Sequence, residues 1–216
     1  MLTREENELL CRVGAEAPMG KMLRRYWIPA LMSSELESGG APKRVRLLGE
    51  DLVAFRDGAG RAGILDENCP HRGSSLVLAR NEDCGLRCLY HGWKIDVAGN
   101  VLETPAEPEE STFKERVRAI AYPAREWGGF VWTYMGPPGL EPPELDFPWT
   151  RLPEDHSVVI KVRTECNWVQ ALEGVIDSAH GNYLHSNLLK PASGLSATVL
   201  REDGRLDRPS DDGAPT

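Results

Sequence analysis

Two short segments of the sequence each carry one cysteine and one histidine. The first is Cys69-Pro70-His71, and the second, separated from it by sixteen residues, is Cys88-Leu89-Tyr90-His91. Thiolate sulfur and imidazole nitrogen are ligands for zinc, copper and iron–sulfur clusters, so the two segments together form a candidate metal centre. A cluster of two irons can divide four protein ligands between them and transfer electrons.

The mixture of ligand types separates the possible metals. Zinc sites usually take C-x2-C or H-x3-H pairs from each segment, whereas these segments read C-x-H and C-x2-H. Two thiolates on one iron and two imidazoles on the other is the Rieske arrangement of a [2Fe-2S] cluster. We therefore predict that Cys69, His71, Cys88 and His91 bind such a cluster, with zinc as the alternative.

A second group of possible ligands comprises Asp177, His180 and His185. Asp177 and His180 are three residues apart and share one face of a helix predicted from Asn167 to about His180. His185 lies about 500° further along a regular helix, so the helix must bulge or end near Gly181-Asn182 for both imidazoles to converge. Two histidines and one carboxylate with open positions form the facial triad of non-haem Fe(II) oxygenases. The alternative is a helix with two unrelated histidines and a solvated aspartate.

Short strands joined by turns are expected to hold the first group. Pro70, Gly73, Gly85 and Gly92 flank its four ligands, as expected where the backbone turns tightly and approaches a cluster closely. The runs of apolar residues around them predict a small antiparallel β domain. These runs are 45–48, 52–55, 62–65, 93–95, 101–102 and 130–134.

Helices and a linker are expected on either side of this β domain. Thr3 and Glu6 form a capping box that predicts a helix to about Val13, and Pro18 opens a second helix that ends near residues 27–29. Residues 136–153 are dense in proline and predict a linker or wrapped connection. Strands are predicted over 158–162 and from 195 to 200.

Composition excludes several classes of protein. A net charge of -8 argues against binding to nucleic acid, and no run of eighteen apolar residues is present that could span a membrane. The N-terminus lacks the basic start and apolar run of a secretory signal. Five cysteines, with two in a metal-type spacing, are not a disulfide framework. We expect a cytoplasmic protein.

Both metal motifs together resemble the oxygenase component of the Rieske non-haem iron aromatic-ring-hydroxylating oxygenases. The opening residues 2–10, with Pro18-Met19-Gly20 and the segment 24–30, resemble the phthalate dioxygenase branch of that family. The resemblance implies an α+β fold, in which an antiparallel all-β Rieske domain with short N-terminal helices precedes the start of a helix-grip-like catalytic domain. The implied parts are 1–27 as a helical lead, 28–135 as the Rieske domain, 136–156 as the Pro-rich linker and 157–216 as a partial catalytic domain.

The resemblance also implies roles for individual residues and partners. His180 and His185 match two ligands of a mononuclear Fe(II), and Asp177 matches the acidic residue that bridges the iron site and a cluster histidine of a neighbouring subunit. An NAD(P)H-dependent flavin and iron–sulfur reductase is expected to supply electrons. An aromatic compound and O2 are the expected substrates, and the expected assembly is a homo-oligomer such as a trimer.

One feature of the family has no counterpart in this sequence. The third iron ligand of the family is an aspartate from much later in the catalytic domain, whereas this sequence ends at Thr216. We therefore expect the N-terminal part of an oxygenase, which binds the cluster well and the mononuclear iron poorly. The alternatives are a Rieske electron carrier without substrate chemistry and an inactive fragment.

Overall fold

The computed structural model describes residues 2–184. The chain divides into two compact units, Met1–Val162 and Arg163–Thr216. The predicted division into four parts stays a prediction. Among the described residues, no helix is both long enough and apolar enough to cross a lipid bilayer. The predicted strand over 195–200 lies outside the described residues.

The first unit begins with two short helices. In α1 (Arg4–Cys11) the predicted capping box is present, because the Thr3 hydroxyl accepts the Glu6 N–H and the Glu6 carboxylate accepts the Thr3 N–H. The second helix, α2 (Pro18–Leu23), starts at the predicted proline. Its predicted extension to residues 27–29 was wrong, since these residues open strand β1 (Trp27–Met32). Pairing with a distant strand and burial of Trp27 outweigh the local preference.

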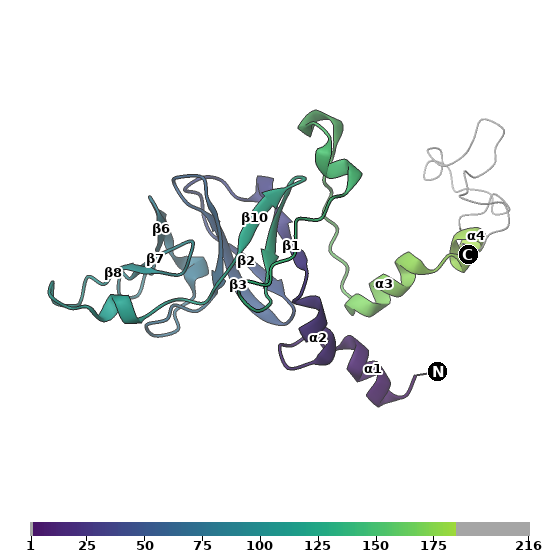
Figure 1. Cartoon of the computed structure of the whole chain (residues 1–216), viewed down its shortest axis with the longest axis horizontal. Helices are drawn as coiled ribbons and strands as arrows, with labels where there is room; N and C mark the ends of the chain where they lie inside the picture. The colour runs from purple at the N-terminus through teal and green to yellow at the C-terminus, as the bar shows by residue number, and fades with distance from the viewer. Residues whose placement is uncertain (1, 185–216) are drawn as a thin grey trace. The chain divides into compact units, whose positions relative to one another are not determined.

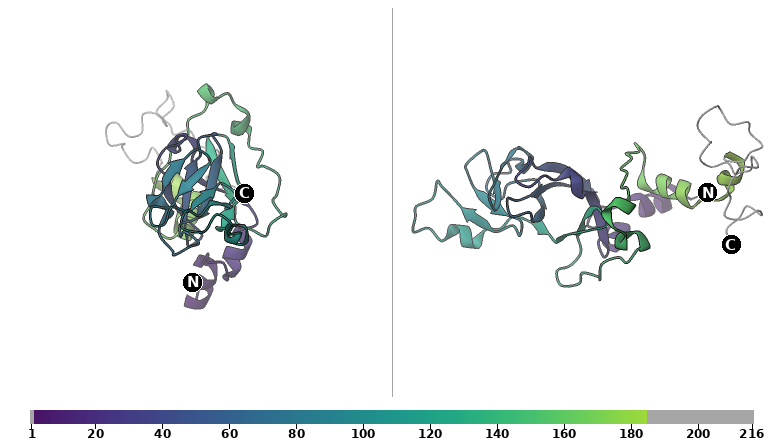
Figure 2. Two further views of the ribbon diagram at one scale, coloured as in Figure 1. Left: turned by 90° about the vertical axis from the view of Figure 1, so that its left-hand side faces the viewer. Right: turned by 90° about the horizontal axis from the view of Figure 1, so that it is seen from above.

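Eleven strands in the described residues form three antiparallel sheets (Figures 1 and 2). The first sheet has the order β1-β11-β10, the second β2-β3-β4-β9, and the third β5-β6-β7-β8. The six predicted runs all lie in or beside these strands. The other strands are β2 (Lys43–Leu47), β3 (Glu50–Arg56), β4 (Ala62–Asp66), β5 (Arg80–Glu82), β6 (Gly85–Arg87), β7 (Lys94–Asp96), β8 (Val101–Glu103), β9 (Ala121–Tyr122), β10 (Ala124–Trp127) and β11 (Phe130–Tyr134). Short 3-10 helices cover Ser33–Glu35, Leu76–Leu78, Phe113–Arg116, Pro148–Arg151 and Glu154–His156.

Strand β3 separates two hydrophobic cores. Leu52 and Ala54 pack in a core with residues of β1 and β11, whereas Val53 and Phe55 pack in a core with residues of β6 and β7. All four side chains are fully buried. Successive residues of a strand point to opposite faces, which explains why this run is apolar without a polar residue in alternation. The core shared with β6 and β7 also contains Cys69 and Cys88.

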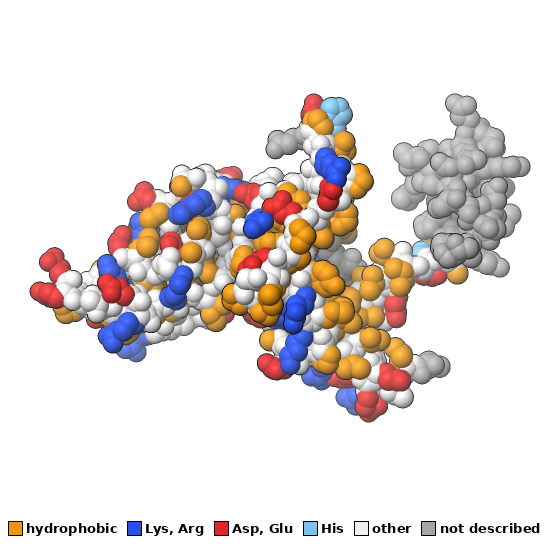
Figure 3. Space-filling model, in the orientation of Figure 1, with side chains coloured by type: hydrophobic (Ala, Val, Ile, Leu, Met, Phe, Trp, Pro, Cys, Tyr) orange, Lys and Arg blue, Asp and Glu red, His pale blue; other side chains and the backbone are white. Residues whose placement is uncertain are grey.

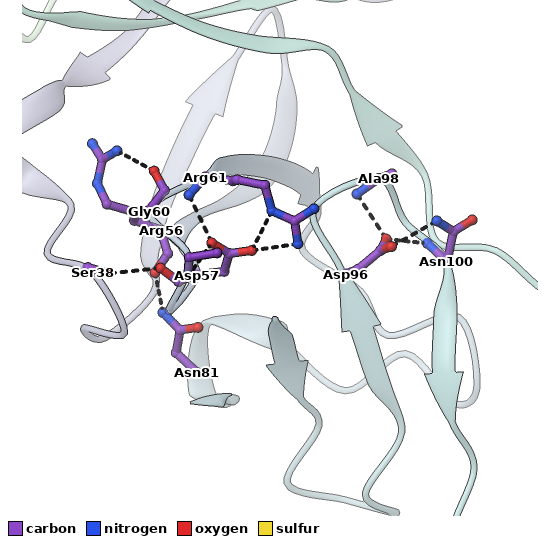
Figure 4. Close-up of polar contacts among 10 residues, drawn as sticks. Ser38, Arg56, Asp57, Gly60, Arg61, Asn81, Asp96, Ala98 and Asn100 are labelled. Atoms are coloured by element: carbon purple, nitrogen blue, oxygen red, sulfur yellow. Dashed lines mark hydrogen bonds and ion pairs between the residues drawn. The ribbon is translucent and has the colours of Figure 1, made fainter. Parts of the chain in front are cut away.

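Two turns of the β unit are built in the same way, each round an aspartate (Figure 4). Asp57 Oδ1 accepts the N–H groups of Ala59 and Arg61 at 3.0 and 2.8 Å. Asp96 Oδ1 accepts the N–H groups of Ala98 and Asn100 at 2.9 and 2.8 Å. In both turns the side chain satisfies the second and fourth N–H groups after it, so the β3–β4 and β7–β8 turns are fixed by local hydrogen bonds.

The Pro-rich segment lies against the β unit. The Trp27 indole Nε1–H donates to the Pro142 carbonyl at 2.8 Å, and the Tyr134 hydroxyl donates to the Leu140 carbonyl at 3.1 Å. Leu145 and Trp149 pack against the aromatic cluster of Trp27, Trp132 and Tyr134. Because proline has no N–H, this segment cannot pair with a strand through regular backbone ladders. Side-chain donors of the β unit bind its carbonyls instead.

The strand predicted over 158–162 was wrong, because the structure has no strand there. Val158, Ile160 and Val162 are 86%, 78% and 80% exposed. The run of apolar residues is present, but a strand also needs a partner for its N–H and C=O groups.

The second unit contains two described helices. Helix α3 (Trp168–Ile176) begins where the Asn167 side chain accepts the Val169 N–H at 2.9 Å. Helix α4 (Ala179–Leu184) follows after Asp177 and Ser178. The interruption predicted near Gly181-Asn182 was wrong in position, since α4 runs through those residues. The helical segment is interrupted at Asp177. The backbone of this residue is extended, and its carboxylate accepts the Ala179 N–H at 2.8 Å.

Candidate metal centre

The first candidate loop follows β4 and carries Cys69 and His71. The Cys69 N–H donates to the Ser74 carbonyl at 2.9 Å, and the Gly73 N–H donates to the Cys69 carbonyl at 2.9 Å. Gly73 has φ +68°, which a residue with a Cβ adopts only at a cost. The two hydrogen bonds close a tight loop round the cysteine and the histidine.

The second candidate loop joins β6 to β7 and repeats this pattern. The Cys88 N–H donates to the Trp93 carbonyl at 2.9 Å, and the Gly92 N–H donates to the Cys88 carbonyl at 3.0 Å. Gly92 has φ +74°. In each loop the cysteine therefore pairs with a glycine four residues later and with the carbonyl five residues later. The histidine is two residues after Cys69 in one loop and three residues after Cys88 in the other.

The two thiols meet in the core. Cys69 and Cys88 are each 3% exposed. Burial, together with the neighbouring Cys88 thiol, raises the pKa of Cys69 to about 11, although the N–H groups of His71 and Arg72 act in the opposite direction. A thiol with this pKa keeps its proton at neutral pH, so metal binding here must release it.

The two imidazoles lie together beside the thiols. The ring centroids of His71 and His91 are 4.5 Å apart at an interplanar angle of 68°. Desolvation lowers the pKa of His71, and the neighbouring His91 and Arg72 lower it further. His71 is therefore neutral at pH 7, and a neutral imidazole has a nitrogen lone pair for a metal. Both histidines are more exposed than the cysteines.

The four donors are of the types that a two-iron cluster takes. Within residues 2–184, no group of three or more His, Cys, Asp or Glu side chains lies close enough together to hold a metal ion. The donors form a buried thiol pair and a more exposed imidazole pair. A [2Fe-2S] cluster with two thiolates on one iron and two imidazoles on the other needs this division.

An ion pair holds the base of the first loop. Glu67 accepts hydrogen bonds from Arg44 Nε at 2.8 Å and from the Ser75 hydroxyl at 2.6 Å. The Glu67 carbonyl also accepts the Leu76 N–H at 2.7 Å. Arg44 holds the pKa of Glu67 below its ordinary value. Glu67 and Arg44 are separated by more than twenty residues, so sequence reasoning missed this contact, which depends on the registers of β2 with β3 and of β3 with β4.

The second group of predicted ligands lies in the second unit. The Asp177 Oδ2 and His180 Nδ1 atoms are 3.0 Å apart, so this pair is brought together. The pKa of Asp177 is lowered, first by the Ala179 N–H and then by His180. Both side chains are more than two-fifths exposed. His185 lies outside the described residues.

Two family models match different parts of the chain. Residues 26–121 match the Rieske [2Fe-2S] domain, and residues 133–216 match the domain described as LigXa C-terminal domain like. The first match contains both candidate loops. The fold and the four donors thus define an iron–sulfur protein of the Rieske class.

Individual relatives narrow this class. The whole chain is 52% identical to the phthalate 4,5-dioxygenase oxygenase subunit of Pseudomonas putida and covers 49% of that protein. Over 95% of its length it is 48% identical to the 3-chlorobenzoate-3,4-dioxygenase oxygenase subunit of Comamonas testosteroni, of which it covers 46%. The chain therefore spans about half the length of the curated relatives it matches.

A solved structure shows the same likeness. The reduced complex between oxygenase and ferredoxin in carbazole 1,9a-dioxygenase contains a chain 29% identical, with a TM-score of 0.65. The match covers 82% of the present chain and 44% of that chain. The present chain belongs to the Rieske aromatic-ring-hydroxylating oxygenase alpha subunits and is phthalate dioxygenase-like.

Proposed function

We propose that the chain serves as the oxygenase component of an aromatic-ring-hydroxylating system. Cys69, His71, Cys88 and His91 hold the [2Fe-2S] cluster, and His180 and His185 are ligands of a mononuclear Fe(II). The observation that carries the proposal is the convergence of a buried thiol pair and an imidazole pair from two loops of the same construction. Bound in these places, the cluster supplies single electrons and the ferrous ion activates O2.

The protein side chains prepare the cluster site for this task. Burial of Cys69 and Cys88 excludes water from the thiolate side. Trp93, which is 2% exposed, lies parallel to the His71 ring and limits its rotation. The imidazole pair is the more exposed side of the site, so His71 and His91 would be the ligands of a bound cluster that face its electron-transfer partners.

Asp177 orients the proposed iron ligand His180. A carboxylate that accepts the Nδ1–H of an imidazole fixes the tautomer and leaves Nε2 as the metal-binding nitrogen. The 3.0 Å separation of Asp177 Oδ2 from His180 Nδ1 supports this role. Because its pKa is lowered, Asp177 stays ionised at neutral pH. Between subunits of a homo-oligomer, the same carboxylate links this site to a cluster histidine.

The names of two relatives support a substrate class, and the family resemblance supports an electron donor. Phthalate and 3-chlorobenzoate, named for two of them, are both aromatic carboxylates. We therefore propose an aromatic carboxylate as substrate, with O2 as co-substrate. Electrons come from an NAD(P)H-dependent reductase that contains flavin and an iron–sulfur centre.

Metal analysis of the isolated chain tests the proposal. The expected result is two irons matched to two acid-labile sulfides per chain, with a smaller, weakly held amount of iron that exceeds the sulfide. His180→Ala should remove the excess iron and leave the sulfide-matched iron and its EPR signal unchanged. Zinc without sulfide would refute the cluster, and excess iron unaffected by His180→Ala would refute the second site.

A further inference from the structure

Arg87 lies at the start of the second candidate loop and is largely buried. It is the last residue of β6, immediately before Cys88, and its side chain is 17% exposed. In the β6–β7 register, Arg87 is opposite Lys94, the residue that follows the loop. Arg87 and Lys94 therefore mark the two ends of the loop that carries Cys88 and His91.

Each of the three guanidinium nitrogens of Arg87 has a different acceptor. Nε donates to the Glu82 carboxylate at 2.5 Å and Nη2 to the Glu103 carboxylate at 2.7 Å. Nη1 donates to the Gly92 carbonyl at 2.8 Å. Glu82 belongs to β5 and Glu103 to β8, so a single side chain ties both outer strands of the third sheet to the ligand loop.

The charges of this sheet are arranged round the same contact. Basic and acidic side chains alternate over the part of the surface formed by β6–β8 (Figure 3). Arg87 holds the pKa values of Glu82 and Glu103 below their ordinary values, so both carboxylates stay charged at neutral pH. Charge-assisted hydrogen bonds of this kind are stronger than neutral ones and fix the geometry of a planar guanidinium.

The acceptor in the loop is the residue next to the proposed ligand. Gly92 follows His91, and its N–H donates to the Cys88 carbonyl while its own carbonyl accepts from Arg87. These two hydrogen bonds restrain the peptide planes on both sides of Gly92. The restraint matters because Gly92, with φ +74°, has no Cβ that would limit its backbone. Without Arg87, the backbone that carries His91 loses this restraint.

We infer that Arg87 is a positioning residue for the cluster. Its hydrogen bond to the Gly92 carbonyl fixes the backbone at His91 and Gly92. This inference rests on the proposed function of the two loops. Partners that orient metal ligands typically change metal affinity about 10- to 100-fold when they are mutated. The role depends on the three-way fork of the guanidinium and not on its charge alone, because the compact ammonium of a lysine does not reproduce the rigid planar fork.

Three variants and a matched control test the inference. Arg87→Lys keeps the charge and removes the fork, Arg87→Gln removes both, and Glu103→Gln weakens one arm of the fork by removing the charge of its acceptor. Arg80→Gln is the control, because Arg80 pairs with Glu82 in the same sheet at 3.1 Å while its side chain is 66% exposed. The measurements are the rate of iron release to a chelator and the histidine-nitrogen couplings in the EPR spectrum of the reduced cluster. Far-UV circular dichroism checks the fold.

We expect Arg87→Lys and Arg87→Gln to release iron about tenfold faster than wild type and to change the nitrogen couplings. Glu103→Gln should show the same changes more weakly. Arg80→Gln should behave as wild type. Wild-type release and couplings in Arg87→Lys would overturn the inference. If neither Arg87 variant folds, Glu103→Gln decides in the same way. A wild-type chain without sulfide refutes the proposed function and the role of Arg87 with it, whereas a loaded wild type with unchanged variants refutes the role of Arg87 alone.

Discussion

The Trp93 indole and the His71 imidazole lie parallel, with ring centroids 4.6 Å apart and an interplanar angle of 3°. Trp93 comes from the second loop and His71 from the first, so this stack joins the two loops through side chains. Trp93→Ala should lower the free energy of unfolding by about 3–5 kcal/mol, because it leaves a cavity in a closed core. It should also speed loss of the cluster absorption, whereas Trp93→Phe keeps a ring and has a smaller effect.

Urea unfolding and visible absorption measure these two effects. Trp149→Ala is a suitable control, because Trp149 packs on Phe130 and lies in neither loop. Equal rates of cluster loss in the Trp93 and Trp149 variants would mean that the stack does not support the metal centre.

The cysteines give a second prediction. Cys88→Ser should abolish the sulfide content, since the buried thiol pair loses one member. Cys84→Ser changes a partly buried cysteine four residues earlier and should leave iron and sulfide unchanged. Loss of sulfide in Cys84→Ser with retention in Cys88→Ser would reverse the assignment of the ligand.

Glu67 is the subject of a third prediction. Glu67→Gln weakens the bonds to Arg44 and Ser75 beside the first loop, and should cost about 1–3 kcal/mol of stability. Asp51→Asn breaks the exposed pair of Arg46 and Asp51 and should change stability by less than about 0.5 kcal/mol. Equilibrium urea unfolding of both variants measures the difference, and equal values would show that Glu67 has no special part in the loop.

The pH dependence of stability is predicted at Glu126. Arg56 donates two hydrogen bonds of 2.6 Å to this carboxylate and holds its pKa below the ordinary 4.5. The unfolded chain therefore binds the proton first as the pH falls. The stabilisation is fully present above about pH 5 and is lost as the pH falls through the folded pKa.

Glu126→Gln removes this contribution. The difference in unfolding free energy between wild type and variant should be constant from about pH 7 to about pH 5 and should shrink at lower pH. Urea unfolding at each pH measures it, with Glu144→Gln as the exposed control. A difference that stays constant down to about pH 3 would contradict the role of the ion pair.

Sequence reasoning succeeded where a feature depends on neighbouring residues. The capping box at Thr3 needs only Glu6, and the helix start at Pro18 needs only the proline itself. The glycines and proline round the cysteines and histidines likewise predicted that both segments are loops, and the structure places each segment in a tight turn. These features are encoded over fewer than six residues.

Features that need a distant partner could not be predicted in this way. Trp27 starts a strand because it pairs with Tyr134, and Val158 to Val162 form no strand because no partner is paired with them. The break at Asp177 was misplaced because its own carboxylate caps α4, a choice that competes with continuing the helix. Arg87 carried no sequence signal, since its acceptors in β5 and β8 meet it only through strand register.

The contact of the Pro-rich segment with Trp27 and Tyr134 bears on how the protein can be dissected. A chain shortened to end at residue 135 would leave an indole N–H and a phenol without their carbonyl acceptors and would uncover the aromatic cluster. A piece that keeps these side chains satisfied and the cluster covered must extend past Trp149, and the first compact unit ends at Val162. The Pro-rich segment thus covers the aromatic cluster of the β unit, and a shortened protein should retain it.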